Sequence, residues 1–155
     1  MWKDKHSQVR SSLGISPSYM PWTQPSSGNP PRLTGVPRNE RYIDVINIAW
    51  ASRPAKHRKL PYYVNISQCP SRAQWASDLK CLTTSSRVYD FGRDCMISAT
   101  ECAMLQGIPA REVDLSMFSN TALFNAAGSA MCAPCIGTIM LTVWLNPEAV
   151  WWKPK

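Results

Sequence analysis

The stretch Ser98-Ala-Thr-Glu-Cys-Ala-Met-Leu-Gln-Gly-Ile-Pro109 carries the clearest local signal in the 155-residue chain. The Ser98 hydroxyl can accept a hydrogen bond from the Glu101 amide while the Glu101 carboxylate reaches back to the Ser98 amide, which is a capping box. Gly107 can take the left-handed conformation that ends a helix, and Pro109 blocks continuation. The sequence therefore predicts a helix of about two turns over residues 99–106.

Further along, residues 115–147 contain no charged side chain, and residues 130–145 are nearly continuous apolar sequence. Pro134 fits the first turn of a helix, where its missing amide hydrogen costs little. A helix over residues 133–145 would be about 20 Å long, short of the ~30 Å hydrocarbon core of a bilayer. We therefore predict no membrane partner. The alternative is a single membrane span near residues 126–145, with the Trp151-Trp152-Lys153 sequence at the interface.

Positive charge gathers in residues 1–60, which carry ten Lys or Arg and three acidic residues. Residues 61–155 carry seven of each, so the whole net charge of +7 lies before residue 61. This asymmetry favours one half that faces a polyanion and another that packs. The densest run, RPAKHRK at residues 53–59, could replace the condensed counterions on nucleic-acid phosphates. The alternative for this run is a solvated loop.

Proline density predicts an irregular or disordered segment over residues 1–38, because neither a helix nor a central strand tolerates so many prolines. The prolines concerned are Pro17, Pro21, Pro25, Pro30, Pro31 and Pro37. Residues 40–51 predict a short element of uncertain type. Their apolar residues Ile43, Ile46 and Trp50 follow helical spacing, but their β-branched content also fits a strand. Residues 62–66, Tyr-Tyr-Val-Asn-Ile, predict a strand.

The first residues are charged and lack the apolar core of a signal peptide, which predicts an intracellular protein with reduced cysteines. Cys132-Ala-Pro-Cys135 has the spacing of a metal or redox pair, but a structural zinc needs four ligands and the histidines are only His6 and His57. We therefore predict no metal site, and two small thiols at a buried helix entry. Cys69 is interpreted as structural, because the neighbouring sequence supplies no base.

Residues 93–109 resemble the ninth motif block of DNA cytosine-5 methyltransferases, which reads approximately R-x-L-T-x-x-E-x-A-x-L-Q-G-F-P. The matching residues are Arg93, Glu101, Ala103, Leu105, Gln106, Gly107 and Pro109. Residues 127–134, Ala-Gly-Ser-Ala-Met-Cys-Ala-Pro, resemble the tenth block, a G-N-A-[VM] followed by an apolar helix entered through proline. The two blocks also follow the order and spacing of that family.

The resemblance implies an α/β fold, namely a partial Rossmann-like fold of S-adenosylmethionine-dependent methyltransferases behind the Pro-rich residues 1–38. Residues 39–155 would be a C-terminal fragment of the methyltransferase domain. Within it, residues 39–80 would be a remnant of the target-recognition region, and residues 81–145 would hold both motif blocks. The cofactor-binding residues would be Gly128, Ser129, Ala130 and Met131. The DNA-binding residues would be Arg53, Lys56, Arg58, Lys59 and Arg72.

Departures from the family shape the predicted function. The chain has no F-x-G-x-G cofactor loop, no P-C-Q with the nucleophilic cysteine and no E-N-V with the base-contacting glutamate. We therefore predict a C-terminal fragment or degenerate copy of a DNA cytosine-5 methyltransferase, with no catalytic residue of its own. It would bind DNA in the nucleus or elsewhere inside the cell, and bind no S-adenosylmethionine alone. A separate chain could supply the missing motifs. The alternative is a non-enzymatic, basic nucleic-acid-binding protein.

Overall fold

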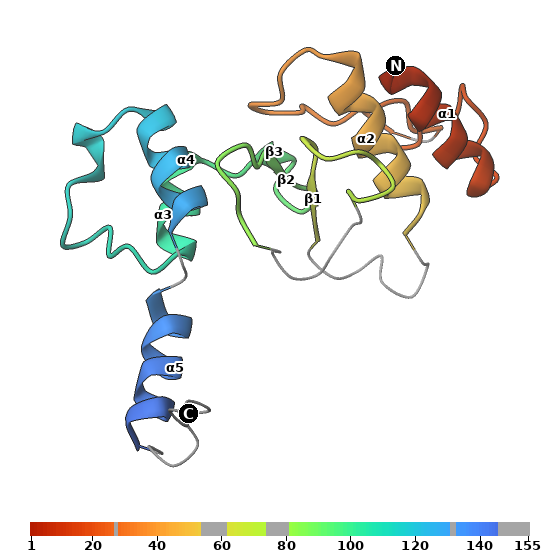
Figure 1. Cartoon of the computed structure of the whole chain (residues 1–155). Helices are drawn as coiled ribbons and strands as arrows, with labels where there is room; N and C mark the ends of the chain where they lie inside the picture. The colour runs from red at the N-terminus through yellow and green to blue at the C-terminus, as the bar shows by residue number, and fades with distance from the viewer. Residues whose placement is uncertain (27, 54–61, 74–80, 131–132, 146–155) are drawn as a thin grey trace, which may run out of the picture. The chain divides into compact units, whose positions relative to one another are not determined.

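The computed structural model describes residues 1–26, 28–53, 62–73, 81–130 and 133–145 (Figure 1). The chain divides into two compact units, Met1–Ile97 (the N-terminal unit) and Ser98–Lys155 (the C-terminal unit). The domain boundary between residues 38 and 39 stays a prediction from the sequence. Arg10 and Leu33, which precede it, hydrogen-bond to Asp44 and Asp94 within the N-terminal unit.

The described residues form a mixed α/β protein. In the N-terminal unit, the elements are α1 (Trp2–Ser12), α2 (Glu40–Ala51), β1 (Tyr63–Asn65), β2 (Val88–Asp90) and β3 (Cys95–Met96). In the C-terminal unit, they are α3 (Ala99–Leu105), a 3-10 turn (Leu115–Met117), α4 (Asn120–Ser129) and α5 (Ala133–Leu145). The strand predicted over residues 62–66 is confirmed as β1.

The sheet is antiparallel, with the strand order β1-β2-β3. Val64 pairs with Tyr89, which pairs in turn with Met96. No parallel sheet of the Rossmann type is present among the described residues, so the expected part of such a sheet is not seen here. The physical reason is that β2 and β3 are joined by residues 91–94 only, whereas parallel neighbours need a crossover of about a dozen residues or more.

Helix α1 corrects the prediction of an irregular segment over residues 1–38. The prolines begin only at Pro17, so nothing in residues 2–12 breaks a helix. The Asp4 carboxylate accepts a hydrogen bond from the Met1 amino group at 2.8 Å, in the first turn, where a negative charge is favourable. After α1, residues 13–38 are irregular where described, apart from an isolated bridge between Thr34 and Cys95.

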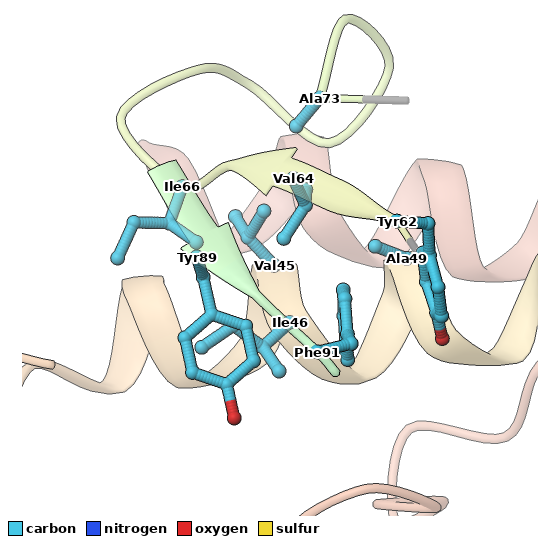
Figure 2. Packing of buried hydrophobic residues seen from close by; sticks show 9 residues of the cluster. All are labelled: Val45, Ile46, Ala49, Tyr62, Val64, Ile66, Ala73, Tyr89 and Phe91. Atoms are coloured by element: carbon cyan, nitrogen blue, oxygen red, sulfur yellow. The ribbon is translucent and has the colours of Figure 1, made fainter. Parts of the chain in front are cut away.

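Helix α2 resolves the uncertain element over residues 40–51. The Asn39 side chain caps its start by accepting a hydrogen bond from the Arg41 amide at 3.0 Å. The helix buries Val45, Ile46 and Ile48, which do not lie on a single face. Helix α2 can bury more than one face because the sheet packs across one side of α2 and α1 also contacts α2 (Figure 2). Packing therefore decides the type of an element whose spacing alone was ambiguous.

The core of the N-terminal unit lies between α2 and the sheet, where aliphatic side chains of the helix meet aromatic side chains of the strands (Figure 2). Its buried members are Val45, Ile46, Ala49, Tyr62, Val64, Ile66, Ala73, Tyr89 and Phe91. The Tyr62 and Phe91 rings stack with their centroids 4.3 Å apart. Trp22, from the Pro-rich segment, packs against this cluster and donates its indole N–H to the Tyr89 hydroxyl at 2.9 Å.

Asp94 joins the Pro-rich segment to the sheet. Its φ of 52° turns the chain between β2 and β3, and its carboxylate accepts hydrogen bonds from the Leu33 amide at 3.1 Å and from the Tyr89 hydroxyl. Burial and this carboxylate raise the pKa of Tyr89 well above its ordinary value, so the hydroxyl remains a donor. Gly35, at φ 75°, lies so close to β3 that an added Cβ would meet Met96 Cβ at 3.3 Å.

The C-terminal unit has a small core of its own, in which α3 packs against α4. Its buried members are Ala99, Ala103, Leu115 and Leu123. The start of α4 is capped by the Ser119 hydroxyl, which accepts a hydrogen bond from the Ala122 amide at 3.2 Å. This core has four buried members, two of them alanines, against nine in the N-terminal unit, so it contributes less apolar burial.

Helix α5 exposes most of its apolar side chains. The exposed side chains include Ile139, Met140, Leu141, Val143, Trp144 and Leu145, with Trp144 at 78%. Pro134 lies in its first turn, as predicted. Among the described residues, Asn120–Leu145 is the one stretch long and apolar enough, by length and composition, to cross a membrane: its most apolar 18-residue window has a mean hydropathy of 1.6 and is 7% buried. The prediction of a helix over residues 133–145 is confirmed.

Candidate functional site

The predicted DNA-binding residues lie in different environments. Arg53 is only 5% exposed, and its guanidinium lies 3.6 Å from the centre of the Tyr62 ring and 5.3 Å from that of Trp50. This cation–π packing makes Arg53 part of the aromatic cluster rather than an open surface. Arg72 is exposed. The other three predicted residues, Lys56, Arg58 and Lys59, lie outside the described residues.

Three cations from separate segments lie around the turn that follows β1. Arg72 belongs to this turn, and its amide donates to the Cys69 carbonyl at 2.8 Å. Lys5, on α1, and Arg41, on α2, are close enough for their charges to act on the Cys69 thiol. Arg41 also donates to the Ser67 carbonyl at 2.9 Å. We call Lys5, Arg41 and Arg72 the basic group.

The pKa of the Cys69 thiol is lowered by its surroundings. A hydrogen bond from the Ser71 hydroxyl, with the oxygen 3.4 Å from the sulfur, is the main cause that lowers the pKa of the Cys69 thiol. The positive charges of Lys5 and Arg41 lower it further. The Ser71 hydrogen bond is the largest cause of this shift, and the charges of Lys5 and Arg41 act in the same direction, as they would on a phosphate oxygen.

Helix α3 lies within residues 93–109, the segment in which the sequence predicts a capped helix. The Ser98 hydroxyl accepts from the Glu101 amide at 3.2 Å, and a Glu101 carboxylate oxygen accepts from the Ser98 amide at 2.8 Å, which confirms the predicted capping box. At the other end, the amides of Gly107 and Ile108 donate to the carbonyls of Met104 and Ala103 at 2.9 and 3.2 Å. With Gly107 at φ 84°, this is a Schellman motif, so the predicted stop is confirmed as well.

The predicted cofactor-binding residues lie at the end of α4. Gly128 and Ser129 are its last two residues, Ala130 caps it in an extended conformation, and Met131 lies outside the described residues. Ser129 is exposed, and none of the three described residues lines the cavity between α1 and α2. These residues by themselves do not fit S-adenosylmethionine, which needs a concave site with convergent polar groups.

The cysteines separate into different chemical environments. Burial, with the nearby Glu101 carboxylate, raises the pKa of the Cys102 thiol on α3, opposite to the direction at Cys69. Cys135 is exposed in the first turn of α5, so the prediction that it is buried at a helix entry is wrong. Its CxxC partner, Cys132, lies outside the described residues.

Sequence reasoning missed a buried polar cluster between α1 and α2. Arg10, on α1, donates from its Nε to an Asp44 carboxylate oxygen at 3.1 Å, and His6 Nδ1 lies 2.6 Å from the other oxygen. Two further bonds, from Arg10 to the carbonyls of Ser16 and Tyr19, hold the chain after the helix. The spacing of Trp2, His6, Val9 and Arg10 was the available signal, because it places these residues along one helical side.

No protein-family model matches the chain, and no curated protein sequence matches it either.

Proposed function

We propose that the chain is a C-terminal part of a DNA cytosine-5 methyltransferase that binds DNA and is not catalytic alone. The observation that carries the proposal is the pairing of sequence and geometry at residues 98–109. There the ninth-block pattern coincides with a short helix fixed at both ends, by the capping box and by Gly107. The tenth-block residues follow at the end of α4, before the proline-entered apolar helix α5.

The exposure of α5 supports the idea of an incomplete domain. A helix that is apolar on all sides belongs in the interior of a larger protein or in a membrane. A partial Rossmann-like fold would leave such a helix without the sheet that covers it in a full domain. We therefore propose that the partner is a chain, or a longer form of this chain, that carries the missing sheet and catalytic motifs.

DNA binding is proposed at the basic group rather than at Arg53. Lys and Arg side chains gain affinity for DNA when they displace condensed counterions, and this needs side chains that can reach a phosphate. Lys5 and Arg72 are exposed and Arg41 is half-buried, whereas Arg53 lies against two aromatic rings. Lys56, Arg58 and Lys59 keep their predicted role as additional contacts.

The salt dependence of DNA binding tests the role of the basic group. We expect the double variant Lys5→Ala/Arg72→Ala to bind a mixed-sequence duplex more weakly. The slope of log binding constant against log salt concentration should become shallower by about 1–2, at ~0.9 per lost phosphate contact. Fluorescence anisotropy from 50 to 200 mM salt would measure it. Arg111→Ala, which removes an exposed cation of the C-terminal unit, is the matched control and should leave the slope unchanged. Equal slopes for all three proteins would contradict the assignment.

Cofactor affinity tests the family assignment separately. Residues 1–155 alone should bind S-adenosylmethionine no more tightly than about millimolar, because the sequence lacks the F-x-G-x-G cofactor loop and has Ser129 in place of the asparagine of the tenth block. A calorimetric titration that gave a micromolar dissociation constant would contradict the proposal. Adding a protein fragment with the F-x-G-x-G and P-C-Q motifs should create measurable cofactor binding.

The second candidate is a non-enzymatic nucleic-acid-binding protein, which the basic group favours without any help from the motif blocks. The two candidates differ in the complementation experiment. DNA binding that depends on Lys5 and Arg72, together with no cofactor binding after the catalytic fragment is added, would favour the second candidate.

A further inference from the structure

A cavity of about 510 Å³ lies between α1, α2 and the residues that follow α1. Apolar side chains make up much of its wall, contributed by Trp2, Pro17, Met20 and Ile43. His6 also lines it. This volume lies within the ~300–1,000 Å³ of typical small-molecule sites, which are mostly apolar with a few fixed polar groups.

His6 is the fixed polar group of this cavity. Its side chain is only 4% exposed, and Asp44 holds its Nδ1 at 2.6 Å. The Asp44 carboxylate is itself held by the Arg10 guanidinium, which can only donate. The carboxylate therefore accepts from Nδ1–H. In the neutral ring, this leaves Nε2 as a hydrogen-bond acceptor.

Nothing in the described part of the chain bonds to Nε2 of His6, whose contacts are Asp44 at Nδ1 and the edge of the Trp2 ring. His6 nevertheless lines the cavity. A buried ring with one nitrogen anchored and the other without a bond, in the wall of a cavity, is suited to bind a ligand, since buried polar atoms are normally paired.

We propose that this cavity binds a small, neutral aromatic molecule with an N–H or O–H donor, which hydrogen-bonds to His6 Nε2. The Trp2 ring lies beside His6, with the two centroids 4.8 Å apart and the rings at 71°, so an aromatic ligand finds an aromatic wall next to its acceptor. The ionic groups of the site are already paired, Arg10 with Asp44 and Lys3 with Glu40 at 3.5 Å, which favours a neutral ligand over a charged one. This site is separate from the basic group and does not depend on the proposed function.

The test compares indole with 1-methylindole on the full chain at pH 8. The two probes share the same ring system, but the methyl group of the second removes the N–H donor. We expect indole to bind with a dissociation constant of about 1 mM or tighter, as suits so small a ligand, and 1-methylindole to bind at least about five-fold more weakly. In long-range ¹H–¹⁵N spectra, indole should shift the Nε2 resonance of His6, and 1-methylindole should leave it unchanged.

Two variants locate the binding. Ile43→Phe should abolish indole binding by filling the cavity, and Ser7→Ala, a change at the cavity wall that leaves His6 intact, should preserve it. The proposal is overturned if indole shows no binding at 10 mM (roughly ten times the expected constant), or if both probes bind equally. It is also overturned if indole leaves the His6 resonance unmoved. If the Ile43→Phe variant does not fold, the comparison of indole with 1-methylindole on the unchanged protein still tests the proposal.

Discussion

The two units treat their apolar side chains in opposite ways. The N-terminal unit covers α2 with a sheet and α1, and it also encloses a polar cluster formed by Arg10, Asp44 and His6. The core of the C-terminal unit buries two alanines and two leucines, while α5 leaves large apolar side chains exposed. The difference indicates that apolar burial stabilises mainly the N-terminal unit.

The largest effect should come from the buried ionic cluster of the N-terminal unit. Asp44→Ala should lower the free energy of unfolding by about 3–5 kcal/mol, because it leaves the buried Arg10 guanidinium without its carboxylate. Urea unfolding followed by tryptophan fluorescence would measure the loss. The control is Asp114→Ala, which removes a fully exposed carboxylate from the C-terminal unit. Similar losses of unfolding free energy for Asp44→Ala and Asp114→Ala would contradict the difference in stability between the two units.

The next effect concerns the end of α3 in the C-terminal unit. Gly107→Val should lower the free energy of unfolding by at least about 1–2 kcal/mol, because Gly107 has a φ of 84° and a branched Cβ is strained there. Gly137→Ala on α5 is the matched control. An added Cβ at Gly137 meets no atom within 4 Å, so the change should be neutral or slightly stabilising. Calorimetric unfolding of both variants measures the difference, and an unperturbed Gly107→Val protein would refute the Schellman assignment.

A smaller effect is expected at the start of the same helix. Ser98→Ala should cost about 1 kcal/mol, the usual loss for a serine that caps a helix. Ser98→Asp should recover most of it, since aspartate also accepts from the amide of the third helical residue. The two variants differ in helix capping and not in any contact with DNA. The loss should therefore be seen as a lower midpoint of thermal unfolding and not as weaker DNA binding. A Ser98→Ala protein that bound DNA less well at unchanged stability would contradict this assignment.

The smallest effect on stability is expected on α5. Leu141→Glu should change the free energy of unfolding by no more than about 0.5 kcal/mol, because Leu141 is exposed, but it should increase solubility. Leu123→Glu places the same change in the buried contact between α3 and α4 and should unfold the C-terminal unit. Chemical unfolding and sedimentation would measure both. If Leu141→Glu instead removed binding to lipid vesicles, the membrane alternative for Asn120–Leu145 would be favoured over a protein partner.

The sequence predicted those features that depend on neighbouring residues. The capping box of Ser98 and Glu101 and the stop at Gly107 are set within a dozen residues, so they could be inferred directly. Helix α1 was missed because the prolines that follow it dominated the composition of residues 1–38. The burial of Arg53 was missed because it depends on Tyr62, the residue before β1, whose ring lies under the Arg53 guanidinium. The strand pairing likewise depends on Asp94, whose φ of 52° no spacing rule predicts.

The bonds between Asp94 and the Pro-rich segment also order events in time. The amide of Leu33 and the carboxylate that accepts from it are 61 residues apart in the chain. At a synthesis rate of ~5–20 residues per second, Leu33 is made roughly 3–12 s before its acceptor exists. The interval between Trp22 and its hydrogen-bond acceptor Tyr89 is longer still, because 67 residues separate them in the chain. During synthesis, the first part of the chain therefore exposes apolar side chains whose cover has not been made, and this interval is when a chaperone would have most to protect.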